Sequence, residues 1–432
     1  MERCTMQQYI AATQSILDMD DDDDLLSNAS TDASSLSFSF SSLSFSSSSS
    51  FSLSSSSDAN GISDDDTSLG NAAVTSTVAY YNHVYTPLVS ATIEFGCHPL
   101  IGDYSDADCI AYFQFHKTDL QTIVALLWAC LSTKFDGNYE SVVVNNGYRV
   151  PFETGLLICL YHLAYPCRIR PEMECFFGMR KSHISAVLSC FFDVLYDLAN
   201  NYLSNPVIFQ NNFLYYSNLI QAKSQVNLHV WGFIDGTVRR TCCPIHYSVE
   251  SFSGHKKCYG IKFQAIMAPD GIIASIFGPV PAGRHDAFLL AESNLLHDLQ
   301  AMMPTNGDNP VYCLYGDSAY PLSQHLLVGF RFAEPGSPEA AFNTAMAKVS
   351  QCVEWGFHQV SSQWKTLDFV SNQKFYSMPI GQYYIVGTFF QTLGQLFMEA
   401  KFVNISNQNL PLWKNISIWQ IFRTTTTTTS KI

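Results

Sequence analysis

Two apolar runs that each end in an aspartate constrain the fold of this chain more than any other feature. Val230–Ile234 leads into Asp235 in the block Trp-Gly-Phe-Ile-Asp-Gly-Thr, and Val311–Tyr315 leads through a glycine into Asp317. Short apolar runs rich in β-branched and aromatic residues are typical of buried strands. A carboxylate at the end of such a strand is held rigidly at the edge of the sheet.

A third acid, Glu354, lies in Cys-Val-Glu-Trp-Gly-Phe (352–357), inside a helical pattern. Hard cations such as Mg²⁺ take oxygen ligands, and two such ions can clamp the attacking and leaving oxygens of a phosphoryl displacement. We therefore expect the side chains of Asp235, Asp317 and Glu354 to converge within roughly 4–8 Å, the scale of a two-metal site. Taken singly, Asp235 would be a turn residue before Gly236, and Glu354 an acid on a helix surface.

Residues 1–75 differ in composition from the rest of the chain. Asp20–Asp24 is a run of acids and Ser34–Ser57 is mostly serine, which predicts a disordered tail. This tail is either inert or a segment for phosphorylation or partner binding. Most of the formal charge of −14 falls within it. The remainder is near neutral, so the overall acidity does not exclude a DNA partner.

The cysteine content and the length of the apolar stretches indicate the cellular compartment that we expect for this protein. Thirteen cysteines occur without any Cys-x-x-Cys pair, and Cys130, Cys159, Cys190 and Cys313 have apolar neighbours. This predicts reduced, buried thiols in an intracellular protein, with a zinc site as the alternative. Residues 1–10 do not resemble a secretory signal, and the longest apolar stretches are about half a membrane span. We expect a soluble protein with no membrane partner.

Residues 80–225 are expected to be helical, with order beginning near Tyr80–Pro87. A helix is predicted at Asp119–Leu131, and Pro151–Tyr165 begins with proline in its first turn. A short helix follows at Pro171–Phe177, then a turn, then a long helix to about Leu203 with Ser182 as its N-cap. This order is the outline of a helix-turn-helix or of a plain helical bundle. The start of the long helix carries the candidate DNA contacts Arg180, Lys181, Ser182 and His183.

Residues 226–400 are expected to form an α/β domain with a mixed sheet and helices packed on it. Residues 401–432 are a C-terminal tail of uncertain structure. The predicted strands are His229–Ile234, Tyr259–Ala268, Ile272–Val280 and Pro310–Tyr315, and the predicted helices are Ala287–Met303, Ala340–Leu367 and Tyr383–Phe397.

Six spaced blocks occur in one order along the second half of the chain: Phe233–Thr237, Ser253–Lys257, Lys262–Ala265, Gly283–Asp286, Gly316–Ser318 and Val353–Phe357. With these blocks, the segment from about Trp231 to Leu396 resembles the DDE-type endonuclease domain of Harbinger-like transposases and their domesticated relatives. Residues 150–203 are similar to that family's helix-turn-helix segment. The predicted helix around Glu354 departs from the family pattern at Trp355 and Gln359, where basic residues are common, which weakens the expected DNA contact.

The resemblance implies an RNase H-like fold and metal-dependent cleavage of double-stranded DNA in the nucleus. Asp235, Asp317 and Glu354 would be the catalytic ligands of two Mg²⁺ or Mn²⁺ ions. Asp286, in Gly-Arg-His-Asp, is a fourth candidate: a ligand, an orienting group, or the N-cap of the helix from Ala287 onward.

Basic residues flank these acids and would bind phosphates, although each alone is also explained as a solvated surface charge. A separate DNA-binding partner protein and an oligomer are left open. Two functions remain: an active endonuclease or transposase, and a catalytically silent DNA- or protein-binding factor on the same scaffold. The flanking residues are Arg239, Arg240, His255, Lys256, Lys257, Lys262, Arg284 and His285.

Overall fold

The computed structural model describes residues 98–166, 172–204, 206–303, 310–375 and 377–406 of the 432-residue chain. The side chains of residues 207, 208 and 398–406 are outside this description. The predicted tail 1–75, the predicted start of order near Tyr80–Pro87 and residues 407–432 also lie outside it. Those expectations stay predictions.

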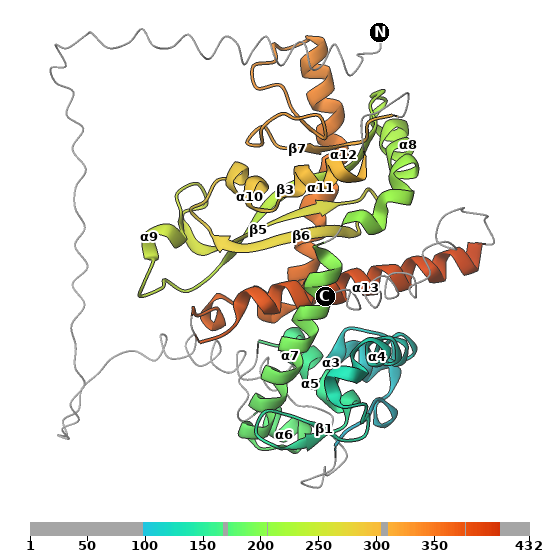
Figure 1. Ribbon diagram of the computed structural model, residues 1–432, viewed down its shortest axis with the longest axis vertical. Helices are drawn as coiled ribbons and strands as arrows, with labels where there is room; N and C mark the ends of the chain where they lie inside the picture. The colour runs from blue at the N-terminus through green and yellow to red at the C-terminus, as the bar shows by residue number, and fades with distance from the viewer. Residues whose placement is uncertain (1–97, 167–171, 205, 304–309, 376, 407–432) are drawn as a thin grey trace, which may run out of the picture. The chain divides into compact units, whose positions relative to one another are not determined.

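The first half of the described chain is mainly helical, as predicted (Figure 1). The predicted N-cap Ser182 is wrong, because α7 begins at Lys181 and Arg180 is its N-cap. The carbonyl of Arg180 accepts hydrogen bonds from the backbone N–H groups of His183 and Ile184 at 2.9 and 3.1 Å, so Ser182 already lies in the first turn. Pro151 likewise precedes α5 as its N-cap. The elements are η1 (Ile101–Asp103), α3 (Asp106–Phe113), α4 (Lys117–Leu131), η2 (Ser132–Phe135), β1 (Val142–Val143), β2 (Arg149–Val150), α5 (Phe152–Ala164), α6 (Glu174–Phe177), α7 (Lys181–Leu203), η4 (Pro206–Asn212) and α8 (Phe213–Ser224).

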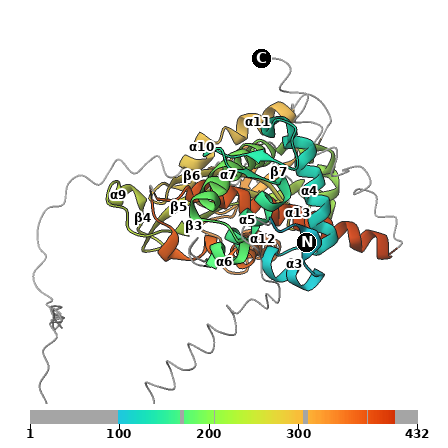
Figure 2. The ribbon, with the colours of Figure 1, turned by 90° about the horizontal axis from the view of Figure 1, so that it is seen from below.

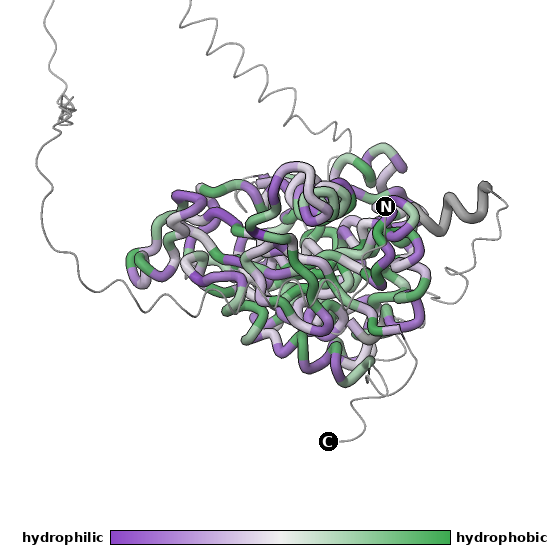
Figure 3. Tube along the Cα trace, turned by 90° about the horizontal axis from the view of Figure 1, so that it is seen from above, coloured by the Kyte–Doolittle hydropathy of each residue, from purple (hydrophilic) through white to green (hydrophobic). Residues whose placement is uncertain are grey.

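The core of this region lies between α5, α7 and the last helix, α13 (Ile380–Ser406). The rings of Phe192 on α7 and Tyr383 on α13 are 4.1 Å apart, and the ring of Phe191 occupies the space beside Gly155 on α5. Within the described residues, α7 is the one helix with the length and composition of a membrane span. Core helices of soluble proteins share those properties. The hydropathy colours in Figure 3 change along the chain, as expected when elements bury one face.

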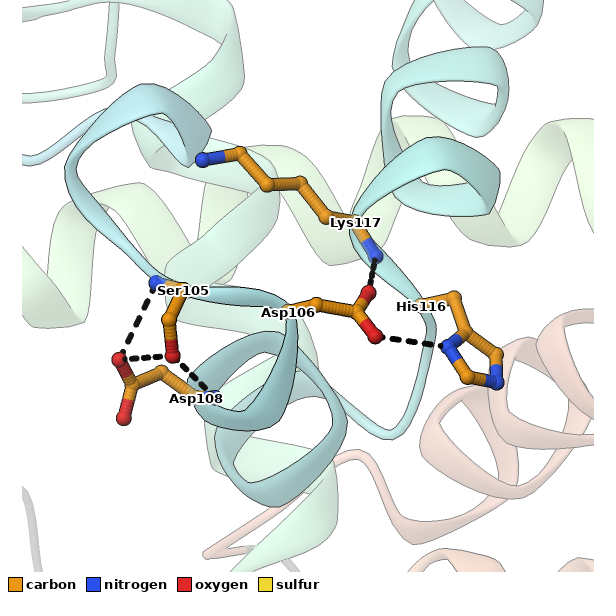
Figure 4. Close-up of polar contacts among 5 residues, drawn as sticks. All are labelled: Ser105, Asp106, Asp108, His116 and Lys117. Carbon is orange, nitrogen blue, oxygen red and sulfur yellow. Dashed lines mark hydrogen bonds and ion pairs between the residues drawn. The ribbon is translucent and has the colours of Figure 1, made fainter.

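A reciprocal cap fixes the start of this region (Figure 4). The Ser105 hydroxyl accepts a hydrogen bond from the Asp108 N–H at 3.2 Å, and the Asp108 carboxylate accepts one from the Ser105 N–H at 3.1 Å. One carboxylate oxygen of Asp106 accepts the Lys117 N–H at 2.8 Å, and the other lies 3.1 Å from Nδ1 of His116. These bonds satisfy free N–H groups at the starts of α3 and α4 and tie the two helices together.

The second half contains a mixed sheet in the order β4-β5-β3-β7-β8, with β6 also paired to β5. β3 pairs antiparallel with β5 and parallel with β7, and β7 pairs parallel with β8. This confirms the mixed α/β class. The strands are β3 (Val230–Arg240), β4 (Phe252–Ser253), β5 (Cys258–Met267), β6 (Ile273–Pro281), β7 (Cys313–Gly316) and β8 (Leu326–Val328).

The predicted end of the first strand at Ile234 is wrong. β3 continues to Arg240 because its pairing with β5 runs on to Arg240 opposite Gly260, whereas its pairing with β7 stops at Ile234 opposite Gly316. Asp235 is therefore inside a strand but directly beyond the parallel pair. The helix predicted at 287–303 is also wrong as one element, since Asn294, with φ of 53°, separates α10 (Asp286–Glu292) from α11 (Leu295–Met302).

Helices cover both faces of this sheet (Figure 2). Phe263 on β5 contacts Tyr384 on α13, with ring centroids 4.5 Å apart, whereas its neighbour Gln264 donates a hydrogen bond to the Ser293 hydroxyl after α10. Consecutive residues of a strand point to opposite faces. Thus α13 lies on one face and the α10–α11 segment on the other. Met267, which shares the face of Phe263, packs against Gly356 of α12 (Pro338–Gln363), and 3-10 turns η5 (Lys365–Leu367) and η6 (Val370–Asn372) lead to α13.

The ten cysteines that the structure describes are not paired with one another, and the reduced state stays a prediction. Cys159 and Cys313 are buried as predicted, whereas Cys130 and Cys190 are half-buried. Burial raises the pKa of all four thiols.

Candidate active site

Asp235 and Asp317 lie side by side at the end of the only stretch where β3 and β7 pair within the described sheet. The last paired residues are Ile234 and Gly316; Asp235 is the next residue of β3, and Asp317 directly follows the end of β7. Neighbouring strands are about 4.8 Å apart, so the register brings together two acids that are far apart in the sequence. Gly316 has no room for a side chain, because a Cβ there would lie 2.8 Å from the Ile234 methyl group.

Glu354 reaches the same place from α12, which packs on β3 and β5. Asp235, Asp317 and Glu354 all line one open cleft of about 570 Å³ between the β3–β7 edge and α12. No histidine or cysteine lines the cleft, and Arg331 is the basic residue among its lining side chains. The structure thus brings the three predicted acids to one polar cleft.

The acids act on one another electrostatically. The pKa of Asp235 is raised to about 6, chiefly by burial and additionally by the negative charges of Asp286, Asp317 and Glu354, while a hydrogen bond from the Gly236 N–H acts in the opposite direction. That bond is 2.7 Å long. When a carboxyl group is desolvated and surrounded by other acids, a nearby cation strongly stabilises its ionised form.

Asp286 occupies the opposite face of the sheet from Asp235. Its Oδ1 lies where a side chain of Gly236 would begin, 2.1 Å from an ideal Cβ, and Gly236 must point away from the face used by Asp235. The carboxylate also forms an ion pair with Lys262 at 2.9 Å. The N-cap alternative for Asp286 is wrong, because His285 is the N-cap of α10 and Asp286 is its first residue.

The donor set of the cleft is all oxygen, which suits Mg²⁺ or Mn²⁺ rather than zinc. Tyr320 does not line the cleft, but its buried hydroxyl has no hydrogen-bond partner within the described residues, and its pKa is raised by burial first and then by the charges of Asp286, Asp235 and Asp317. However, no group of three or more His, Cys, Asp or Glu in the described part of the chain is arranged to hold a metal ion. An ion bound in the cleft would therefore need water or phosphate oxygens beside the carboxylates to complete its ligands, as Mg²⁺ often does.

The sequence pattern did not single out Arg331, which lines the cleft, or Tyr320, which lies near the acids. Arg331 follows β8, a three-residue strand that the sequence did not predict, and its guanidinium donates to the Ser318 carbonyl at 2.9 and 3.3 Å. Tyr320 lies within the block around Asp317, but only the fold shows that its ring packs 3.1 Å from the Cβ position of Gly316. Neither Arg331 nor Tyr320 lies in a sequence pattern that would have predicted its position near the acids.

The candidate DNA contacts fall into two groups. His183 stacks on Tyr148 with ring centroids 3.9 Å apart, Arg239 lies over the Tyr384 ring, and Lys262 is paired with Asp286, so these three already have partners. The others are exposed, although Arg284 also lies over the ring of Phe288. They are Arg180, Lys181, Ser182, Arg240, His255, Lys256, Lys257, Arg284 and His285.

Comparison with known families places this site in a wider class. Residues 234–385 match the family described as DDE superfamily endonuclease, and the match spans all four acids. It supports a nuclease of the transposase type for this part of the chain. The match does not extend to the helices before β3, and it does not distinguish the Harbinger-like branch. No curated protein and no solved structure gives a significant match to the chain.

Proposed function

We propose that this chain is a metal-dependent DNA endonuclease of the transposase type, with an RNase H-like fold. The observation that carries the proposal is the register of β3 and β7, which sets Asp235 beside Asp317 in a cleft that Glu354 also lines. The family match over residues 234–385 supports the same reaction class.

Each acid has a distinct task in this proposal. Asp235, buried between its neighbours, is the central ligand, because its ionised form is stabilised when a cation approaches. Asp317 and Glu354 complete the oxygen donors from β7 and α12. Together the three carboxylates would hold two Mg²⁺ or Mn²⁺ ions, which would supply Lewis-acid chemistry for phosphodiester hydrolysis when bound.

Other residues of the chain position the DNA. Arg331 keeps its guanidinium at the cleft, where its remaining N–H groups can bind a phosphate oxygen. The Tyr320 hydroxyl is available to donate to one of the carboxylates or to a bound water. The placement of Asp286 beside Lys262 supports an orienting role behind the sheet rather than direct ligation.

The exposed basic residues of α7 and of the β3–β5 and β6–α10 connections are proposed to bind double-stranded DNA in the nucleus. The segment α5–α6–α7 is the proposed helix-turn-helix, with Arg180, Lys181 and Ser182 exposed at the start of its last helix. A separate DNA-binding partner protein and an oligomer are compatible with this arrangement.

A second candidate is a catalytically silent DNA- or protein-binding factor on the same scaffold. One observation favours it: no three acids within the described residues are close enough together to hold an ion. The two functions differ in one assay. Purified protein with Mn²⁺ and a supercoiled plasmid should yield nicked circles, and the yield should fall to background in EDTA. Protein that shifts the plasmid on a gel yet leaves it supercoiled would support the silent factor.

A further inference from the structure

The connection between β3 and β5 displays apolar side chains to solvent. Residues 241–257 contain the short helix α9 (Ser248–Ser251) and β4, and they lie at the outer end of these strands (Figures 1 and 2). Ile245 is 92% exposed, Val249 83% and Tyr247 68%. We call these three residues the apolar tip. Single exposed apolar residues are common on protein surfaces, but three within five residues at the end of a projection indicate a contact surface.

The loop that carries the tip is held in place. The Ser251 N–H donates to the Tyr247 carbonyl at 3.1 Å, and the Gly283 N–H donates to the Glu250 carbonyl at 2.9 Å. A Cβ at Gly283 would lie 2.7 Å from that carbonyl oxygen, so the approach requires glycine. The base of the loop is fixed by a 2.8 Å bond from the Cys242 N–H to the Gln373 carbonyl. The apolar side chains are therefore presented by an anchored backbone.

The excess of basic residues around the apolar tip favours a polyanionic partner. From Arg239 to Lys262 the chain has five lysines and arginines and one acid, Glu250, whereas the whole chain has a formal charge of −14. Arg240, Lys256 and Lys257 are exposed, as are His246 and His255. A polyanion is attracted to such a surface. A symmetric dimer through the same surface would bring like charges together.

We propose that residues 241–257 form a wedge that distorts DNA next to the cleft. The basic residues would hold backbone phosphates while the apolar tip enters the duplex and unstacks a base step, as apolar side chains do in minor-groove proteins. The wedge proposal rests on the proposed function, because that function makes DNA the substrate. Continuity with the cleft supports it, since β3 carries both Asp235 and the start of the loop. Figure 3 shows hydrophobic and hydrophilic colours alternating in this projection.

The test compares a perfect 30-base-pair duplex with one that contains a two-nucleotide bulge, by fluorescence anisotropy with the full chain in EDTA. A bulge removes part of the unstacking cost, so the wild-type protein should bind it about tenfold more tightly. The variant Ile245→Ser/Tyr247→Ser/Val249→Ser keeps every charge. It should lose this preference and keep the salt dependence of binding.

The matched control is Lys256→Ser/Lys257→Ser, which keeps the tip. It should keep the bulge preference and reduce the slope of log K against log salt by about 2, one unit for each lost phosphate contact. If the triple variant melts below the wild type, Ile245→Ser alone replaces it, because that side chain is almost fully exposed. Equal bulge preference in the wild-type and tip variants would overturn the wedge.

Two further outcomes separate the wedge from the nuclease. Binding to phosphatidylserine vesicles that depends on the tip, without any bulge preference, would assign the surface to a membrane and overturn the proposal. A bulge preference that depends on the tip, in protein that never nicks DNA, would leave the wedge standing and refute only the endonuclease.

Discussion

Replacing Asp235 with asparagine should stabilise the metal-free protein while removing its activity. Folding raises the pKa of this carboxyl from 3.8 to about 6, first through burial and then through the charges of the other acids. A carboxyl with a raised pKa stabilises the fold only when protonated. Its contribution is complete below about pH 4 and is lost as the pH rises through about 6.

The size of the effect follows from the same shift. Two pKa units correspond to about 3 kcal/mol, an upper limit because the Asp235 side chain remains partly exposed. Asparagine carries no charge, and its side-chain oxygen can still accept the 2.7 Å hydrogen bond from the Gly236 N–H. The Asp235→Asn variant should thus gain up to about 3 kcal/mol at pH 8 and little at pH 4.

Urea unfolding in EDTA at pH 8 and at pH 4 measures this difference. The control is Glu292→Gln on exposed α10 surface, which should change the free energy of unfolding by less than about 0.5 kcal/mol at either pH. A variant that is less stable than the wild type at pH 8, or a gain that is the same at both pH values, would refute the electrostatic description of the cleft.

Two further predictions concern the surroundings of the site, and a third concerns the N-terminal segment. Gly236→Ala should destabilise the fold by about 1–3 kcal/mol in thermal unfolding, because its Cβ meets the Asp286 carboxylate; a neutral result would mean that Asp286 can move freely. Tyr320→Phe should leave the free energy of unfolding unchanged or about 1 kcal/mol higher, since it removes a buried unpaired hydroxyl, yet lower nicking at least tenfold; full activity would exclude a positioning role. A chain that begins at Thr77 should melt at the same temperature as the full chain by calorimetry, because residues 1–75 carry no periodic apolar face.

The sequence predicted β5 and β6 closely because burial leaves a strong local pattern, whereas it placed the start of β7 three residues too early and missed β8. β5 and β6 begin and end within one residue of the predicted strands, and both are apolar runs bounded by a turn at Pro269–Gly271. The continuation of β3 past Gly236 was missed, because glycine and threonine after an aspartate are typical of a turn. Pairing with β5 outweighs that local preference.

The acids could be predicted from blocks of residues, but their roles could not. Motif order identified Asp235, Asp317 and Glu354, which line one cleft. The face of the sheet on which Asp286 lies depends on the alternation of side chains along β3 and on its contact with Lys262. Arg331 enters the cleft from a loop after a strand of three residues, which is too short to leave a periodic pattern.

The most direct test of the account is a nicking assay with four proteins under identical conditions. Wild type, Asp317→Asn, Glu354→Gln and the distant control Glu292→Gln would each be incubated with supercoiled plasmid in Mn²⁺, after circular dichroism has shown equal folding. We expect wild type and Glu292→Gln to nick the plasmid, the two cleft variants to be slower by orders of magnitude, and all four proteins to bind DNA with similar affinity. Equal nicking by the cleft variants, or none by the wild type, would contradict it.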